Sequence, residues 1–196
     1  MQQATLKQTT QEESKVIQST QKSQKGAVIW VCGLAGAGKT TIAQKVFALL
    51  EQKYSNVIFL DGDEIREIFG RSGFSKEERL EVARLIAKLC VFLSKSGLIV
   101  VCATISLFDE IYAFNRAHIS HYFEVFVECS MEELLRRDKK SLYSKAQKGE
   151  IKDVMGIDLT YDTPNAHYVL QNNTADKLDS KVSELYEVVE KFLMQR

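Results

Sequence analysis

The segment GLAGAGKT, residues 33–40, has the composition and spacing of a phosphate-binding loop. It matches the pattern G-x-x-x-x-G-K-[ST] in full, between an apolar run and a stretch with helical spacing. Glycines let backbone N–H groups surround phosphate oxygens, and the N-terminus of the following helix adds a partial positive charge. We expect Lys39 to reach the β- and γ-phosphates and the Thr40 hydroxyl to bind Mg²⁺. The predicted ATP-binding residues are Gly33, Leu34, Ala35, Gly36, Ala37, Gly38, Lys39, Thr40 and Thr41.

The segment LDGDEIR, residues 60–66, places two carboxylates and an arginine where a second apolar run ends. Ligands of open parallel sheets bind at the carboxyl ends of the strands. We therefore expect Asp61 to help hold Mg²⁺ and Asp63 to accept the proton of an acceptor hydroxyl, both in catalytic roles. Arg66, one helical turn after Asp63, is expected to bind an anionic acceptor. The alternative is an acidic turn that only caps the next helix.

The segment RRDKKSLYSKAQKGE, residues 136–150, carries six cations. It follows the fourth apolar run, where small P-loop kinases have a lid that closes over ATP. Closure expels water and brings cations onto the transferring phosphoryl group, and we expect Arg137 and Lys140 to be the catalytic cations. A solvated helix face is the alternative explanation of such a run.

The elements that must position these residues alternate along the chain. Apolar runs predict strands at residues 27–33, 56–63, 98–105, 122–129 and 166–172. Helices are predicted over 40–50, from the capping box of Ser75 and Glu78 to about Gly97, and over 108–116, 131–148 and 176–193. The helix after Ser75 is expected to bury Leu80, Ala83, Leu85, Ile86, Leu89 and Leu93. This alternation predicts an α/β P-loop kinase fold, a mostly parallel sheet with helices on both faces and a basic lid.

The charges of the chain are balanced, with 26 lysine and arginine residues against 26 aspartate and glutamate residues. No overall field favours nucleic acid or an anionic membrane, so we expect neither as a partner. No apolar run is long enough to span a bilayer, and the N-terminus lacks an apolar signal core, which favours a cytoplasmic protein. The four cysteines lack metal-ligand spacing and are expected to be buried, reduced thiols rather than a metal or redox site.

At 196 residues the chain fits one α/β domain, which we place at residues 26–196. Residues 1–25 form a polar extension without aromatic residues, a composition that predicts disorder. The alternative is a helix over EESKVIQSTQKSQ that docks on a partner subunit.

These motifs, in this order, resemble the adenylyl-sulfate kinases, which use ATP to phosphorylate the 3′-hydroxyl of adenosine 5′-phosphosulfate. The most specific pieces are FLDGDEIR followed by GFSKEERLEVAR, and SLYSKAQKGEIK in the lid; GLIVVCATIS and GIDLTYDTP also match. The resemblance implies transfer from ATP, with Mg²⁺, to a small-molecule nucleotide acceptor. By analogy with the family it also implies a homodimer.

The same resemblance implies roles for individual side chains around the acceptor. Phe74 matches the aromatic residue that stacks on the acceptor base, and Arg66 and Arg79 match arginines that bind its anionic 5′-group. Asp63 matches the acid near the 3′-hydroxyl, and Lys140 matches the lid lysine. The acceptor-binding residues implied in this way are Asp63, Arg66, Phe74, Arg79, Ile105, Ser106 and Lys140.

The acceptor side departs from the family pattern, whereas the ATP side keeps it. Asp109 stands where the family has an arginine, and Leu107 where it has a proline. Val82 replaces an asparagine, and Val154 replaces an aromatic residue that faces the acceptor base. These changes favour a different acceptor, as in a divergent branch resembling kinases of cytidine 5′-diphosphoramidate in capsule modification. Neutral drift in a kinase of adenosine 5′-phosphosulfate is the alternative.

Two further classes of function stay open at this point. A nucleotide-binding regulatory module without catalysis would account for the changed acceptor side, although the intact Lys39, Thr40, Asp61 and Asp63 argue against it. A partner-stimulated ATPase has no sequence feature in its favour beyond the phosphate loop.

Overall fold

The computed structural model describes residues 26–138, 141–174 and 176–195. Within these ranges one five-stranded sheet has the order β2-β3-β1-β4-β5, and every neighbouring pair is parallel. The strands are β1 (Ala27–Cys32), β2 (Val57–Asp61), β3 (Ile99–Thr104), β4 (Tyr122–Glu128) and β5 (Tyr168–Gln171). The predicted α/β class and parallel sheet are confirmed, and the carboxyl ends of all strands lie along one edge.

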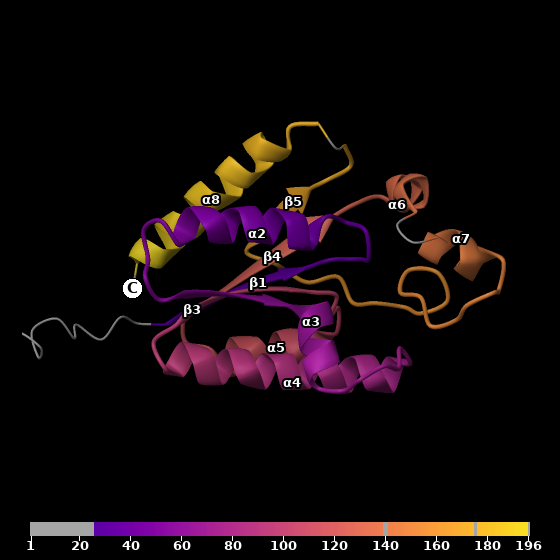
Figure 1. Ribbon diagram of the computed structural model, residues 1–196, viewed down its shortest axis with the longest axis horizontal. Helices are drawn as coiled ribbons and strands as arrows, with labels where there is room; N and C mark the ends of the chain where they lie inside the picture. The colour runs from indigo at the N-terminus through magenta and orange to yellow at the C-terminus, as the bar shows by residue number, and fades with distance from the viewer. Residues whose placement is uncertain (1–25, 139–140, 175, 196) are drawn as a thin grey trace, which may run out of the picture.

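Helices cover both faces of the sheet (Figure 1). On one face α2 (Lys39–Leu50) packs against α8 (Leu178–Met194). On the other face lie α3 (Gly62–Ile68), α4 (Lys76–Lys95) and α5 (Asp109–His118). Two short helices, α6 (Met131–Arg137) and α7 (Leu142–Gln147), project beyond the carboxyl edge of the strands. The phosphate loop and the acidic end of β2 lie at this same carboxyl edge, on the side of the sheet from which α6 and α7 project.

The central strands β1 and β3 are buried along their whole length, as strands covered by helices on both faces must be. This explains why their sequences are unbroken apolar runs rather than alternating ones. All four cysteines are free and buried, as predicted. A hydrogen bond between Cys90 and Cys102, together with burial, raises the pKa of the Cys102 thiol well above its ordinary value, which keeps it protonated.

Helix α4 begins as predicted, because the Ser75 hydroxyl accepts from Glu78 N and the Glu78 carboxylate accepts from Ser75 N. Its buried stripe is shifted from the expected one. The fully buried residues are Val82, Ala83, Ile86, Ala87 and Cys90. Of the predicted set only Ala83 and Ile86 are among them, and the four leucines are half-buried. The leucines lie at the flanks of the contact, where long side chains reach the core from its border.

The basic region predicted as one helix over 131–148 forms two helices instead. The chain leaves α6 at Asp138, which has a positive φ of 30°, and enters α7 at Ser141, which has a φ of 55°. The Asp138 carboxylate accepts from the backbone N–H groups of Tyr143 and Ser144, at 2.9 and 3.2 Å. Asp138 therefore ends one helix and stabilises the first turn of the next, a choice that periodicity alone does not reveal.

Residues 1–25, with their predicted disorder and alternative helix, lie outside the described residues, and so does Lys140. In the part of the chain that the structure describes, no helix combines the length and the apolar character that crossing a membrane requires.

Candidate active site

The phosphate loop joins β1 to α2, and its carbonyl oxygens are held by groups from elsewhere in the fold. Tyr143 Oη of α7 donates to Ala35 O at 2.7 Å, and Arg137 Nη1 of α6 donates to Gly36 O at 3.1 Å. Asn172 Nδ2, just after β5, donates to Ala37 O at 2.7 Å. With three successive carbonyls bonded to the surrounding protein, the loop is held in shape before any ligand binds.

The residues at the start of α2 fit the phosphates of ATP. Gly38 has a φ of 96°, and a Cβ there would lie 2.5 Å from Asn172 Nδ2, so only glycine is accommodated. No side chain caps the N-terminus of α2, which leaves its first N–H groups and its partial positive charge for an anion. Lys39 is buried, and its Nζ donates to Leu34 O at 2.8 Å, inside the loop.

Thr40 and Asp61 form the pair of oxygen groups that fits Mg²⁺. The Thr40 hydroxyl donates to Asp61 Oδ2 at 2.9 Å. Asp61 Oδ1 accepts from Asp63 N at 2.8 Å, which makes Asp61 the N-cap of α3. Each carboxylate oxygen is thus fixed by one partner. A hydroxyl and a carboxylate are hard ligands of the kind that Mg²⁺ takes together with substrate phosphates.

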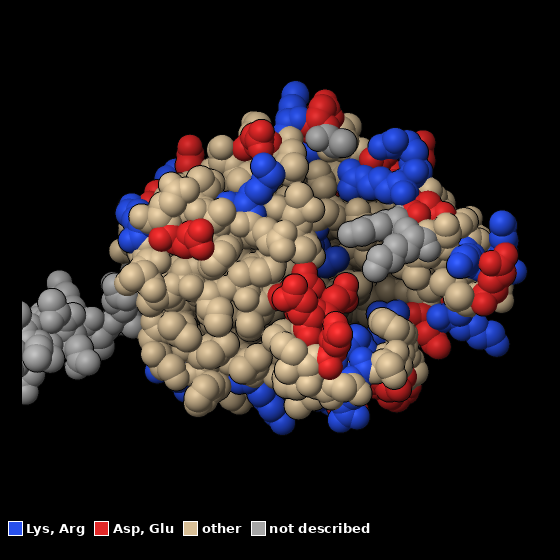
Figure 2. Space-filling view, viewed as in Figure 1, with Lys and Arg blue, Asp and Glu red and all other residues tan. Residues whose placement is uncertain are grey.

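The predicted base, Asp63, is exposed in the first turn of α3. Figure 2 shows acidic side chains gathered over this helix, whose exposed acids are Asp63, Glu64 and Glu67. An anionic ligand over α3 would therefore meet negative charge, whereas the guanidinium groups beside Phe74 provide positive charge.

The three predicted acceptor residues at the α3–α4 junction lie together. Phe74 is 51% exposed, and two guanidinium groups lie over its ring, with the ring centroid 4.8 Å from Arg66 Cζ and 5.2 Å from Arg79 Cζ. Arg66 Nη1 donates to Gly73 O, and Arg79 Nε donates to Phe74 O, both at 2.7 Å. Burial lowers the pKa of both arginines from the ordinary value. The cluster combines a partly exposed aromatic ring with two positive charges in contact with it.

The end of β3 continues into the predicted acceptor wall. Ile105 is half-buried, and Ser106 is buried with its Oγ 2.8 Å from Thr104 Oγ1. Two of the residues that depart from the family pattern, Val82 and Val154, are buried at 3% and 4% exposure. Their side chains offer apolar contact and no hydrogen bond to a base. Asp109, at the start of α5, is exposed.

Arg137, predicted as a catalytic cation of the lid, lies against the phosphate loop. Besides its bond to Gly36 O, Nη2 donates to Asn172 O at 2.6 Å and Nε donates to Glu133 Oε1 at 2.8 Å. The bonds from Arg136 and Arg137 lower the pKa of Glu133 to about 2. All three kinds of guanidinium nitrogen in Arg137 therefore bond to the protein, and the side chain supports the loop. The second predicted lid cation, Lys140, is not among the described residues.

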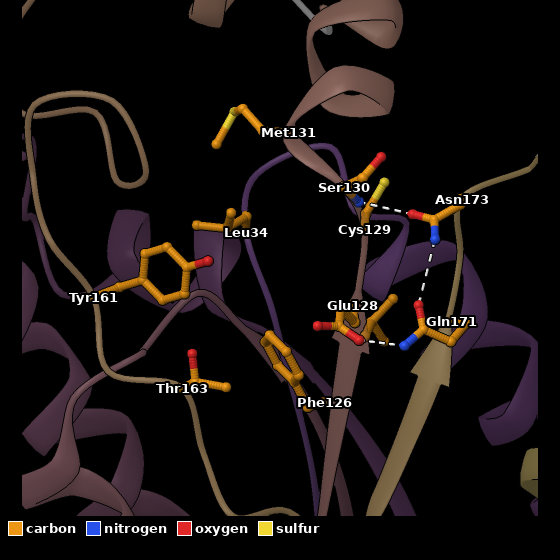
Figure 3. A pocket seen from close by; sticks show the side chains of 11 residues that line it. Leu34, Phe126, Glu128, Cys129, Ser130, Met131, Tyr161, Thr163, Gln171 and Asn173 are labelled. Carbon is orange, nitrogen blue, oxygen red and sulfur yellow. Dashed lines mark hydrogen bonds between the residues drawn. The ribbon is translucent and has the colours of Figure 1, made fainter.

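A cavity of about 380 Å³ lies beside Leu34 of the phosphate loop, at the carboxyl ends of β4 and β5 (Figure 3). Phe126 lies at its floor, and Glu128 and Gln171 form a hydrogen-bonded pair at one side. Tyr161 and Thr163 point into it from the loop before β5. The lining includes Leu34 of the phosphate loop but neither Lys39 nor Asp61, so the cavity lies beside the loop and not over the predicted metal-binding pair.

Sequence reasoning missed two side chains of this region, Asn172 and Asp162, and it did not predict the partner of Arg79. Asn172 bonds to the phosphate loop and accepts from Lys181 Nζ at 3.0 Å, although nothing in its sequence context indicates a ligand-binding role. Arg79 Nη2 donates to Asp153 O at 2.7 Å, across 74 positions of the chain. Asp162 bonds to the start of α5 from a loop 53 positions later. Such contacts between distant segments leave no periodic signal.

Known proteins match most of the chain. Residues 25–171 match the family model described as adenylylsulphate kinase. A cytidine diphosphoramidate kinase from Campylobacter jejuni is 45% identical over 155 residues, which cover 79% of this chain and 91% of the relative. An adenylyl-sulfate kinase from Pseudomonas aeruginosa is 41% identical over 176 residues, covering 88% and 89%. The Mycobacterium tuberculosis APS kinase solved in complex with AMPPNP and APS has a TM-score of 0.74 and 33% identity, covering 85% of this chain and 98% of that one.

Proposed function

Because this chain belongs to the adenylylsulphate kinase family and is an ATP-dependent phosphotransferase, we propose that it phosphorylates the 3′-hydroxyl of cytidine 5′-diphosphoramidate. The general reaction is transfer to a nucleotide with a modified 5′-phosphate. The alternative acceptor within this reaction is adenosine 5′-phosphosulfate. The name of the Campylobacter jejuni relative supports the first acceptor, and the name of the Pseudomonas aeruginosa relative supports the second.

The observation that carries the choice of acceptor is the exposed carboxylate of Asp109 at the end of the acceptor wall. Both 5′-groups carry two negative charges, but only the diphosphoramidate ends in an NH2 group that can donate a hydrogen bond to a carboxylate, whereas the terminal sulfate of phosphosulfate has no donor to offset the repulsion. The buried, apolar Val82 and Val154 act in the same direction, because they provide neither a polar partner for a purine edge nor a second stacking face.

In this proposal the chain's own residues divide the work between donor and acceptor. The phosphate loop, residues 33–41, and Lys39 hold ATP, and Thr40 with Asp61 holds Mg²⁺, which neutralises charge on the phosphates. Asp63 takes the proton of the 3′-hydroxyl. The acceptor is held by Arg66, Phe74, Arg79, Ile105 and Ser106, and Lys140 with Arg137 completes the lid.

The direct test measures ADP release from Mg-ATP with each nucleotide in parallel, together with product analysis for a 3′-phosphate. We expect a higher kcat/KM with cytidine 5′-diphosphoramidate than with adenosine 5′-phosphosulfate. A preference for the adenosine compound would overturn the choice of acceptor and leave the class of enzyme intact. A Lys39→Met variant serves as the inactive control for contaminating kinases.

By the same family analogy we propose a homodimer in the cytoplasm. Light scattering of the full chain measures the oligomeric state, since a dimer has twice the mass of the 22.2 kDa chain. Fractionation of the cells that produce the protein measures its localisation.

A further inference from the structure

The segment between α7 and β5, residues 151–163, is here called the return segment, and it contacts the candidate site in three separate places. First, Asp153 O accepts from Arg79 Nη2 at 2.7 Å, which orients one of the two arginines beside Phe74. Second, Gly156 lies against the phosphate loop and α6. A Cβ at Gly156 would be 2.8 Å from Met131 Cε and 3.4 Å from Leu34 Cδ1.

The third contact is made by Asp162, which joins the return segment to the first turn of α5. Its Oδ2 accepts from Asp109 N at 3.0 Å, its N donates to Leu107 O at 3.2 Å, and its O accepts from Tyr112 Oη at 2.9 Å. Phe108, the N-cap residue of α5, makes no side-chain cap. The carboxylate of Asp162 therefore supplies the cap that the sequence next to this helix lacks.

Asp162 is not among the residues that line the cavity of Figure 3. Its two neighbours, Tyr161 and Thr163, point into that cavity, whereas the Asp162 carboxylate bonds to the first turn of α5. The return segment therefore contacts both the cavity and the acceptor wall.

Hydrogen bonds close a turn in the return segment between its contacts with Arg79 and α5. Asp158 Oδ2 accepts from Asp153 N at 2.8 Å, and Asp158 Oδ1 accepts from Val154 N at 2.6 Å. These bonds hold Asp153 at a φ of 63°, a left-handed conformation that few residues adopt without support. Asp162 follows this turn by four residues, so its docking on α5 restricts where the turn, and with it the Asp153 carbonyl that holds Arg79, can lie.

We propose that Asp162 is a positioning residue for the nucleotide acceptor. Its carboxylate caps α5 from the return segment. This contact sets the distance between the acceptor wall at Ile105 and Ser106 and the guanidinium of Arg79, which Asp153 holds. The inference rests on the proposed function, because the acceptor is the ligand whose binding these groups share. Asp162 itself acts only through the backbone of Leu107 and Asp109 and through Tyr112.

Steady-state kinetics of three variants test this role. Asp162→Ala removes the cap and is expected to raise the acceptor KM about fivefold, a factor equivalent to the typical contribution of one capping oxygen to helix stability, with the ATP KM within about twofold of the wild type. Asp162→Asn keeps an oxygen that accepts from Asp109 N and is expected to restore the wild-type KM. Asp179→Ala, a change of the same type at an exposed position of α8, is the matched control. Equal rises in both KM values, or an Asn variant as weak as the Ala variant, would overturn the inference.

Hydrogen–deuterium exchange provides a readout that needs no acceptor. In Asp162→Ala we expect faster exchange of the amides of Asp109, Asp153 and Val154 than in the wild type or in Asp179→Ala. Tyr112→Phe, which removes only the hydroxyl bonded to Asp162 O, is expected to act in the same direction and covers the case that the Ala variant does not fold. Unchanged exchange over residues 151–159 in these variants would overturn the inference. A wild-type enzyme that phosphorylates neither nucleotide would overturn only the proposed function.

Discussion

The Thr40 hydroxyl donates a 2.9 Å hydrogen bond to Oδ2 of Asp61, a residue 21 positions later in the chain. The bond joins the first turn of α2 to the end of β2, so the groups expected to serve one metal ion are already together without it. The second oxygen of the same carboxylate caps α3 and thereby sets the position of Asp63. The predicted metal-binding pair, the cap of α3 and the position of the predicted base therefore share one side chain.

Asp61→Asn separates the metal-binding role of Asp61 from its capping role. Asparagine caps helices as well as aspartate does, so the folded state is expected to be retained. The lost negative charge is expected to raise the Mg²⁺ concentration for half-maximal activity about 10- to 100-fold. A titration of ADP release with Mg²⁺ measures this, and Thr40→Ser, which keeps the hydroxyl, is the conservative control. An unchanged Mg²⁺ requirement in Asp61→Asn would remove Asp61 from the metal site.

Arg137 and the adjacent Arg136 provide a matched pair for testing support of the phosphate loop. Arg137 is 18% exposed and bonds to Gly36 O and Asn172 O, whereas Arg136 is 68% exposed and bonds to Glu133. Arg137→Ala is expected to lower the free energy of unfolding by about 2 kcal/mol, because it leaves buried carbonyls without a charged donor, and to raise the ATP KM. Arg136→Ala removes an exposed pair and is expected to change stability by less than about 1 kcal/mol.

Denaturant unfolding and ATP kinetics of the two variants decide between support and catalysis. A fall in kcat for Arg137→Ala at unchanged stability and ATP KM would show that Arg137 acts as a catalytic lid cation, as the sequence predicted.

Phe74 is expected to contribute to acceptor binding through its exposed ring. Phe74→Ala is expected to raise the acceptor KM about tenfold, since loss of a stacking face costs on the order of 1–3 kcal/mol per base, and to leave the ATP KM unchanged. Phe92, which is 66% exposed on α4, offers the matched control Phe92→Ala. Similar kinetics for the two variants would mean that Phe74 does not stack on the acceptor base.

Asp109 is expected to discriminate between the two candidate acceptors by its charge. Asp109→Arg is expected to increase kcat/KM for adenosine 5′-phosphosulfate relative to cytidine 5′-diphosphoramidate by about tenfold, because the change removes the carboxylate that can accept from the amidate NH2 and supplies a cation for the sulfate, which has no donor. Asp109→Asn is expected to give an intermediate ratio. Asp179→Arg, also in the first turn of a helix, controls for the unfavourable effect of a cation at a helix N-terminus. An unchanged ratio in Asp109→Arg would place Asp109 away from the 5′-group.

The lowered pKa of Glu133 makes the stability of the protein depend on pH. The bonds from Arg136 and Arg137 lower its pKa from the ordinary 4.5 to about 2 in the folded state. A lowered folded-state pKa means that the stabilisation is present above 4.5 and is lost as the pH falls from 4.5 towards 2. The wild type is therefore expected to exceed Glu133→Gln in its denaturant midpoint near neutral pH, and the difference is expected to shrink over that interval. A difference that stays constant down to pH 2 would exclude titration of Glu133 as the cause.

Local sequence determined the elements whose partners are close in the chain. The capping box of Ser75 and Glu78 predicts the start of α4, because its hydrogen bonds join residues three positions apart. The apolar runs of β1 and β3 predict buried strands, since only strands covered on both faces are apolar at successive positions. The phosphate loop is predictable for the same reason, because its glycines and Lys39 act within one continuous turn.

Only the tertiary structure decided which distant side chains meet. Arg137 bonds to Gly36 O, 101 positions away, Arg79 bonds to Asp153 O, 74 positions away, and Asp162 caps α5 across 53 positions. The sequence shows the cations and the carboxylates but not their partners, because partner choice depends on where the sheet order β2-β3-β1-β4-β5 brings the strand ends. A guanidinium on an exposed lid and one bonded to the phosphate loop have the same sequence signal. They differ only in the carbonyl groups that the fold places within their reach.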